Sequence, residues 1–177
     1  MAIAADEGRS VPRRLVPLLL VVVVFGGLAL TQLRNSEEGI GEQKPVLSVD
    51  FPTTAEAGSI QTAVLHVENP AASDIESLFV SFSALAVGGG EDFPTPIVAG
   101  RVAGSEPAVV DVEPEPTARE QGVRFAFGPL EAGESTTIRF DLRMPEITGR
   151  AANSIAVYDG TIPERATGDS IEITIEG

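Results

Sequence analysis

Few residues of this chain are of a type that could carry catalytic or metal chemistry. The sequence contains no cysteine and a single histidine, His66. This composition excludes thiolate zinc sites, iron–sulfur clusters, a cysteine nucleophile and any relay that needs two histidines. Only Glu68 lies near His66 on the same face of its segment, so we interpret His66 as a surface residue.

Acidic residues near turns are the candidates for binding a cation. Glu91 and Asp92 follow three consecutive glycines, and Asp159 and Asp169 lie in later turns. Ca²⁺ takes about six to eight oxygen ligands, so carboxylates from several turns could hold it. No D-x-D-x-D-G loop is present, and solvated turn acids are the simpler interpretation. We expect no cofactor and keep Glu91 and Asp92 as the candidate metal ligands.

The remaining motifs of catalysis are missing from the sequence. Ser135, Thr136 and Thr137 offer hydroxyl groups, but no G-x-S-x-G elbow surrounds them and the only histidine lies in a different segment. No phosphate loop, dinucleotide fingerprint or H-E-x-x-H pair occurs. The net charge of -14 argues against nucleic acid as a partner, because such affinity comes mostly from Lys and Arg on phosphates. We therefore predict a protein that is not an enzyme.

A long apolar run near the N-terminus dominates the hydropathy of the chain. Residues 15–33 carry no charge, and 15–30 read LVPLLLVVVVFGGLAL. As a helix these residues would span about 28 Å, close to the bilayer core of about 30 Å. The run therefore predicts a transmembrane helix over residues 15–33, with the lipid bilayer as its partner.

The charges that flank this run predict its orientation. Arg9, Arg13 and Arg14 precede it, whereas Glu37 and Glu38 follow soon after it. The positive side faces the cytoplasm, so residues 1–14 form a cytoplasmic tail and the rest lies outside the cell membrane. The alternative is a signal peptide cleaved after the small residues around Ala29, which would release a secreted protein.

Beyond the run the sequence changes first to a linker and then to β-strands. Residues 34–45 are polar and contain two glycines and a closing proline, which is typical of a linker. After them, apolar and polar residues alternate in short segments that Gly, Pro, Asn and Asp separate. The predicted strands are 46–51, 60–68, 75–85, 123–127, 136–144, 154–158 and 170–176, with weaker candidates at 97–102 and 108–112.

Seven to nine short strands without a helix after residue 33 predict an all-β domain. We expect a single immunoglobulin-like antiparallel β-sandwich over residues 46–177, with one transmembrane helix before it. Its core should contain Val, Ile, Leu and seven of the eight phenylalanines. The stretch 112–120, which alternates acid and proline, is expected to be a stiff exposed connector or a docking element.

Two stretches resemble a known family of sandwiches. Phe127–Phe140 reads FGPLEAGESTTIRF, in which Leu130 would close one end of the core and Gly133 would supply a turn. The stretch from Glu56-Ala57-Gly58 to Glu68-Asn69-Pro70 has a second pattern of the same family, in which A-G is followed by an alternating strand and then by N-P. Together they resemble the bacterial adhesion-related, CARDB-like sandwiches. This resemblance implies a fold and no catalytic residues. The chain departs from the family in its insertion at 86–120 and in having one copy of a domain that often occurs in arrays.

These features together predict an interaction module at the cell surface. Ile60, Val64 and Phe79 lie on outward faces, where they would form an exposed apolar patch or lie beneath residues 86–120. The expected function is that of a non-enzymatic accessory or structural subunit, whose partner is another membrane or envelope protein. The alternatives are a ligand-binding, Ca²⁺-binding or adhesion-type domain.

Overall fold

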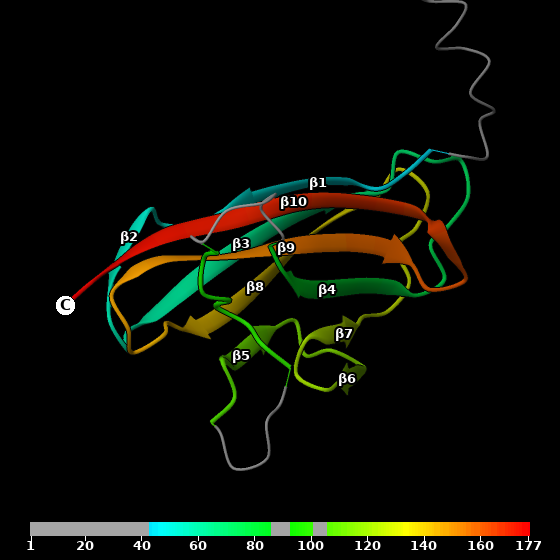
Figure 1. The fold of residues 1–177 in the computed structure, drawn as a ribbon. Helices are drawn as coiled ribbons and strands as arrows, with labels where there is room; N and C mark the ends of the chain where they lie inside the picture. The colour runs from blue at the N-terminus through cyan, green and yellow to red at the C-terminus, as the bar shows by residue number, and fades with distance from the viewer. Residues whose placement is uncertain (1–42, 86–92, 101–105) are drawn as a thin grey trace, which may run out of the picture. The chain divides into compact units, whose positions relative to one another are not determined.

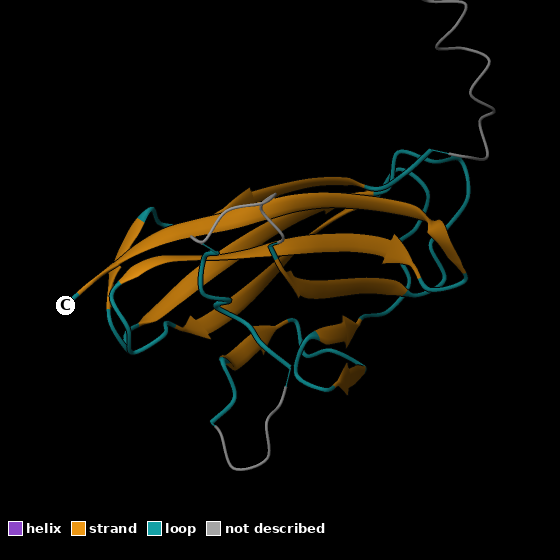
Figure 2. Cartoon of the chain, in the orientation of Figure 1, coloured by secondary structure: helices purple, strands orange, loops and turns teal. Residues whose placement is uncertain are grey.

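The structure is a computed structural model that describes residues 43–85, 93–100 and 106–177. The expected transmembrane segment at 15–33, the tail and most of the linker lie outside these residues, as do Glu91 and Asp92. Within the described ranges no helix is long and apolar enough to cross a membrane. This part of the chain consists of strands and connecting loops (Figure 2), which confirms the prediction of an all-β domain.

In the described part of the chain, ten strands form two sheets that pack face to face, and their arrangement can be followed in Figure 1. The smaller sheet has the order β1-β3-β8-β5, and the larger sheet has the order β2-β10-β9-β4-β7-β6. The strands are β1 (Val46–Asp50), β2 (Thr54–Glu56), β3 (Ile60–Glu68), β4 (Leu78–Ala84), β5 (Val109–Glu113), β6 (Ala118–Glu120), β7 (Arg124–Ala126), β8 (Ser135–Arg143), β9 (Gly149–Asp159) and β10 (Ile162–Glu176).

The sequence predicted most of these strands and missed two. β2 and β6 have three residues each, too few for an alternating pattern to be recognised. β2 also pairs parallel to β10, whereas the other strand pairs are antiparallel as predicted. The weak strand expected at 97–102 does not form over residues 97–100; Ile97 and Val98 are instead buried in the core.

The predicted alternation on the long strands is confirmed, since one face of each strand points into the core. Along β3 the buried residues are Ala63, Leu65 and Val67, which are at most 1% exposed. The corresponding buried residues are Leu78, Val80 and Phe82 on β4, and Ile138, Phe140 and Leu142 on β8. This alternation with a period of two defines the two inner faces of the sandwich.

Aromatic side chains fill the centre of the core. The Phe140 ring lies 5.1 Å from both Phe82 and Phe125 and meets each of them edge to face. Such pairs contribute about 0.5–1.5 kcal/mol beyond the burial of their area. The expectation that seven phenylalanines would enter the core was too high: Phe93 is 64% exposed, while Phe51 and Phe79 are only partly buried.

A buried asparagine joins the two stretches that carry the family resemblance. The Asn69 Nδ2 group donates to the carbonyl oxygens of Ser73, Leu130 and Glu131 at 3.0–3.1 Å. The backbone N–H of Gly133 donates to the Asn69 carbonyl oxygen at 2.8 Å. Leu130 is 2% exposed and Gly133 has a φ of +75°, so both occupy the positions that the sequence predicted for them.

Candidate interaction site

The three residues predicted to mediate interactions lie on different sheets. Ile60 and Val64 belong to β3 in the smaller sheet, whereas Phe79 belongs to β4 in the larger sheet. Ile60 is 49% exposed at the start of its strand, and Val64 and Phe79 are partly exposed. The structure therefore does not bring them together as one apolar patch, and each must be considered with its own neighbours.

On the outer face of the smaller sheet several polar side chains contact one another across strands. The Thr62 hydroxyl donates to the Asp141 carboxylate at 2.7 Å. His66 Nε2 lies 3.5 Å from Asp50 Oδ2, and its Nδ1 atom lies 3.1 Å from the Thr137 hydroxyl oxygen. The neighbours of His66 thus come from β1 and β8 rather than from Glu68, and they are exposed cross-strand contacts. Such a face is typical of a solvated sheet surface.

The outer face of the larger sheet contains an aromatic–arginine cluster, formed by Phe79, Tyr158, Arg124 and Glu120. The rings of Phe79 and Tyr158 are stacked, with centroids 5.6 Å apart and planes inclined by 10°. The Arg124 guanidinium carbon lies 4.2 Å from the Phe79 centroid and 5.6 Å from that of Tyr158. Its Nη1 group donates to Glu120 at 3.1 Å.

Strand register brings this aromatic–arginine cluster together. Phe79 of β4 lies directly opposite Tyr158 of β9, while Arg124 of β7 lies opposite Ser81, two residues along β4. Direct and diagonal neighbours on one face of a sheet are within reach of aromatic and long side chains. Gly160 makes room for the Phe79 ring, since a Cβ atom at this position would lie 2.6 Å from Phe79 Cδ2.

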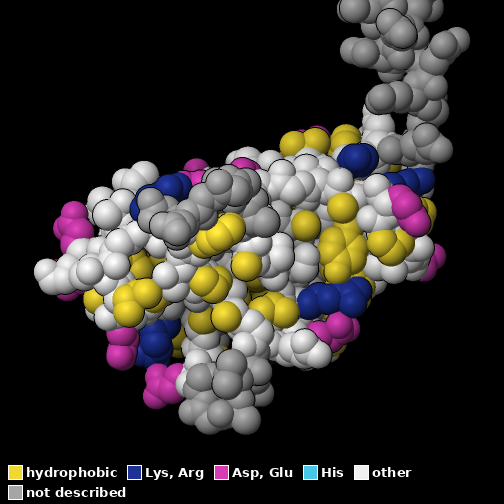
Figure 3. Space-filling model, viewed as in Figure 1, with side chains coloured by type: hydrophobic (Ala, Val, Ile, Leu, Met, Phe, Trp, Pro, Cys, Tyr) yellow, Lys and Arg dark blue, Asp and Glu magenta, His cyan; other side chains and the backbone are white. Residues whose placement is uncertain are grey.

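Tyr and Arg, together with Trp, are enriched among the residues that contribute most to binding at protein–protein interfaces. The aromatic–arginine cluster presents both on a partly exposed surface, and hydrophobic side chains gather on this face with basic and acidic groups beside them (Figure 3). The sequence predicted only Phe79 of these four residues. Arg124 and Tyr158 each follow an alternating pattern, but no local signal places them beside Phe79.

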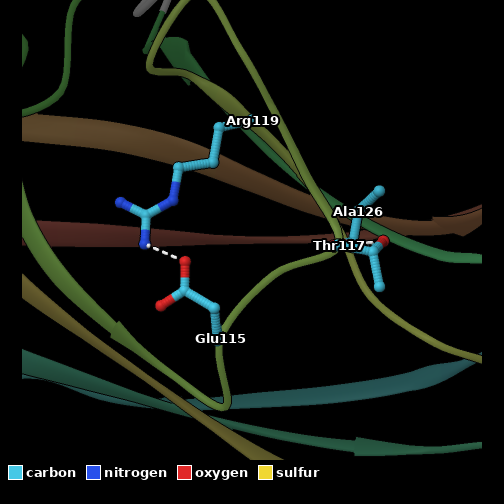
Figure 4. A network of polar contacts seen from close by, with 4 residues as sticks. All are labelled: Glu115, Thr117, Arg119 and Ala126. Atoms are coloured by element: carbon cyan, nitrogen blue, oxygen red, sulfur yellow. Dashed lines mark hydrogen bonds and ion pairs between the residues drawn. The ribbon is translucent and has the colours of Figure 1, made fainter.

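The segment 112–120 connects the two sheets, as the sequence predicted for a connector, but its residues 118–120 form strand β6 instead of a loop. It leads from β5 in the smaller sheet to β6 in the larger sheet. The Thr117 N–H and hydroxyl both donate to the Ala126 carbonyl oxygen, at 2.8 and 3.1 Å. Arg119 donates to Glu115 at 3.0 Å (Figure 4). These contacts hold the connector in place between the sheets.

Asp159 lies at the turn after β9, as the sequence predicted, whereas Asp169 lies inside β10 rather than in a turn. Asp159 is 3% exposed. Its carboxylate accepts hydrogen bonds from the N–H and the hydroxyl of Thr161. Asp169 accepts a hydrogen bond from the backbone N–H of Ser170. Over the described ranges, no three His, Cys, Asp or Glu residues gather so that they could hold a metal ion. The candidate ligands Glu91 and Asp92 lie outside these ranges.

Two packed sheets with this alternating core define an immunoglobulin-like β-sandwich. Several solved structures have a similar fold. They include a CARDB domain from Pyrococcus furiosus, solved in complex with di-metal ions (12% identity, 78% of this chain and 95% of that chain, TM-score 0.44). A PapD-like domain of human CEP192 (17%, 79% and 88%, 0.41) and the bacterial hydrophobin BslA (8%, 75% and 99%, 0.45) are also similar.

These likenesses concern the fold alone, which is also the level at which the sequence resembled the CARDB-like sandwiches. No family model and no curated protein matches the chain.

Proposed function

We propose that this protein is a membrane-anchored, extracytoplasmic interaction module without catalytic activity. Residues 15–33 hold it in the cell membrane, residues 1–14 lie in the cytoplasm, and the sandwich binds another membrane or envelope protein. It acts there as an accessory or structural subunit.

The observation that carries this proposal is the aromatic–arginine cluster on the outer face of the larger sheet. Phe79 and Tyr158 offer a rigid apolar surface, and Arg124 adds a planar cation that is already ordered by stacking and by Glu120. Side chains that are ordered before binding lose little conformational entropy when a partner arrives. The cluster is therefore suited to be the anchor of an interface.

Membrane attachment is supported by the sequence of the N-terminal segment. The uncharged stretch 15–33 is long enough to span a bilayer as a helix. The arginines before it favour a cytoplasmic N-terminus under the positive-inside rule. A binding domain held in this way searches for its partners in two dimensions along the membrane.

The test of the binding role is co-purification of the full chain from its native membranes in mild detergent. We expect a second protein to elute with the wild-type chain at a fixed ratio, identified by mass spectrometry. The Phe79→Ala and Tyr158→Ala variants should lose it. The matched control is Thr137→Ala on the outer face of the smaller sheet. A wild-type chain that elutes alone, or a partner retained by every variant, would contradict the proposal.

The test of the topology uses the absence of cysteine from the chain. Single cysteines are introduced at Ser10 and at the exposed Ser73, and intact cells are treated with a membrane-impermeant maleimide. We expect Ser73→Cys to react in intact cells and Ser10→Cys to react only after the cells are permeabilised. If a Ser73→Cys chain is released into the medium without residues 1–29, the segment is a cleaved signal peptide instead.

A further inference from the structure

The two sheets meet along one side of the sandwich and separate along the other. β1 runs beside β10 on the first side (Figure 1). On the opposite side, which we call the open side, β5 and β6 are the end strands of their sheets. The open side contains a cavity of about 220 Å³ between the two end strands. An end strand presents backbone groups that another extended chain can contact.

The cavity on the open side has an apolar floor. Phe125 and Val109 line it and are 1% and 6% exposed, and Pro107 adds a third apolar surface. Val110 lies at the mouth and is 41% exposed. Arg119, which donates to Glu115 at 3.0 Å, also lines the cavity, together with Gln121 and Gly122. This shape and lining suit an apolar side chain that enters from solvent.

A β-bulge explains why Val110 reaches this cavity. Val109 lies opposite Leu142 and Asp111 lies opposite Asp141, so Val110 is an extra residue of β5. A bulge bends its strand and redirects the side chain of the extra residue. Val110 thereby contributes to the mouth of the cavity.

The outer side of β5 is acidic. Asp111 and Asp141 lie directly opposite each other, an arrangement of like charges that destabilises a sheet. Asp141 accepts a hydrogen bond from Thr62, and Glu113 lies 3.7 Å from Arg139. Asp111 makes no ion pair with any described residue. These residues line a depression of about 430 Å³ next to the open side.

We propose that the open side binds an extended segment of a partner protein in which apolar and basic residues alternate. Successive side chains of an extended chain point to opposite sides. One set would enter the apolar cavity, and the other would place Lys or Arg beside Asp111 and relieve its repulsion with Asp141. A second copy of this chain is a poor occupant, because two copies that each carry a charge of -14 repel each other.

The first test measures the binding of synthetic peptides to the full chain in mild detergent by fluorescence anisotropy. The probe is a nonapeptide that alternates valine and arginine. The comparison peptide has the same composition with its arginines grouped together. We expect saturable binding of the alternating peptide and at least about tenfold weaker binding of the grouped peptide. Equal binding of the two peptides would overturn the proposal.

Charge reversal locates the binding site on the open side. Asp111→Lys should weaken binding of the alternating peptide by about tenfold, the effect of losing one close charge pair. The matched control is Asp50→Lys, which makes the same change of net charge on β1 at the other edge of the smaller sheet. Binding to this control should change by less than about twofold at physiological salt, where distant charges are screened. Equal weakening of peptide binding by both variants would show that binding depends only on net charge, which would overturn the proposal.

Disulfide trapping provides a second measurement of position. Val110→Cys is mixed with the alternating peptide carrying one cysteine at a central apolar position. The control is Ile147→Cys, which is 55% exposed between β8 and β9. We expect the disulfide to form at position 110 at least about tenfold faster than at 147, and equal rates would contradict the proposal. Failure of these tests leaves the aromatic–arginine cluster as a separate candidate, because its test is co-purification.

Discussion

The side-chain amide of Asn153 pairs with the backbone of Val98 as a second strand would. The Val98 N–H donates to Asn153 Oδ1 at 2.8 Å, and Asn153 Nδ2 donates to the Val98 carbonyl oxygen at 2.9 Å. The same Nδ2 group also donates to the Ser83 carbonyl oxygen at 2.9 Å. Asn153 is fully buried. Through these hydrogen bonds it joins β9 to the end of β4 and to the segment 93–100.

Removal of this amide should destabilise the sandwich strongly. Asn153→Ala leaves the buried N–H and carbonyl of Val98 and the partly buried carbonyl of Ser83 without this partner, and each unsatisfied buried group costs about 1–3 kcal/mol. We expect a loss of at least about 3 kcal/mol in the free energy of unfolding, measured by urea denaturation. The control Ser154→Ala, on the opposite face of β9, should stay within about 0.5 kcal/mol. A loss below 1 kcal/mol for Asn153→Ala would show that solvent replaces these hydrogen bonds.

Replacement of the second buried asparagine, Asn69, should also destabilise the sandwich. Asn69→Ala removes the hydrogen bonds to Ser73, Leu130 and Glu131, and we expect a loss of about 2–4 kcal/mol in the free energy of unfolding. Hydrogen exchange should accelerate at the Gly133 N–H, which is bonded to the Asn69 carbonyl oxygen. Unchanged exchange there would mean that the turn is held independently of the amide.

Gly160 should control the geometry of the aromatic–arginine cluster. A methyl group at this position collides with the Phe79 ring, so Gly160→Ala should displace the ring from its stacked position on Tyr158. Tyr158 is the only tyrosine and the chain has no tryptophan, so tyrosine fluorescence reports on this site alone. We expect a changed emission intensity and a loss of about 1–3 kcal/mol in stability. The control Gly128→Ala, where no atom lies within 4 Å of the added Cβ, should leave the emission unchanged.

The turn between β6 and β7 offers a stabilising substitution. Gln121 and Gly122 both have positive φ angles, of 51° and 72°, as a type I′ hairpin turn requires. Asparagine tolerates this conformation better than glutamine, so Gln121→Asn should raise the free energy of unfolding by about 0.5 kcal/mol. Gln121→Ala serves as the control and should not stabilise the protein. Stabilisation of equal size by alanine would exclude backbone conformation as the cause.

The sequence determined the class of the fold and most strands because each long strand carries its own alternating pattern. Residues 60–68 and 136–144 showed which side chains enter the core, and the structure agrees almost residue by residue. The turn at Gly133 and the burial of Leu130 at one end of the core were also predicted, because both follow from local residue types. The apolar run at 15–33 is an equally local signal.

Only the tertiary structure decided which strands are neighbours and in which register. Phe79, Arg124 and Tyr158 come from three separate strands, and their contact depends on pairings between segments far apart in the chain. The partners of Asn153 and the cavity on the open side have the same origin. An alternating pattern shows which face of the sheet a side chain occupies. It contains no information about which strand lies beside it. The sequence therefore predicted a sandwich, and the pairing and packing of its strands decided which side chains meet on its surface.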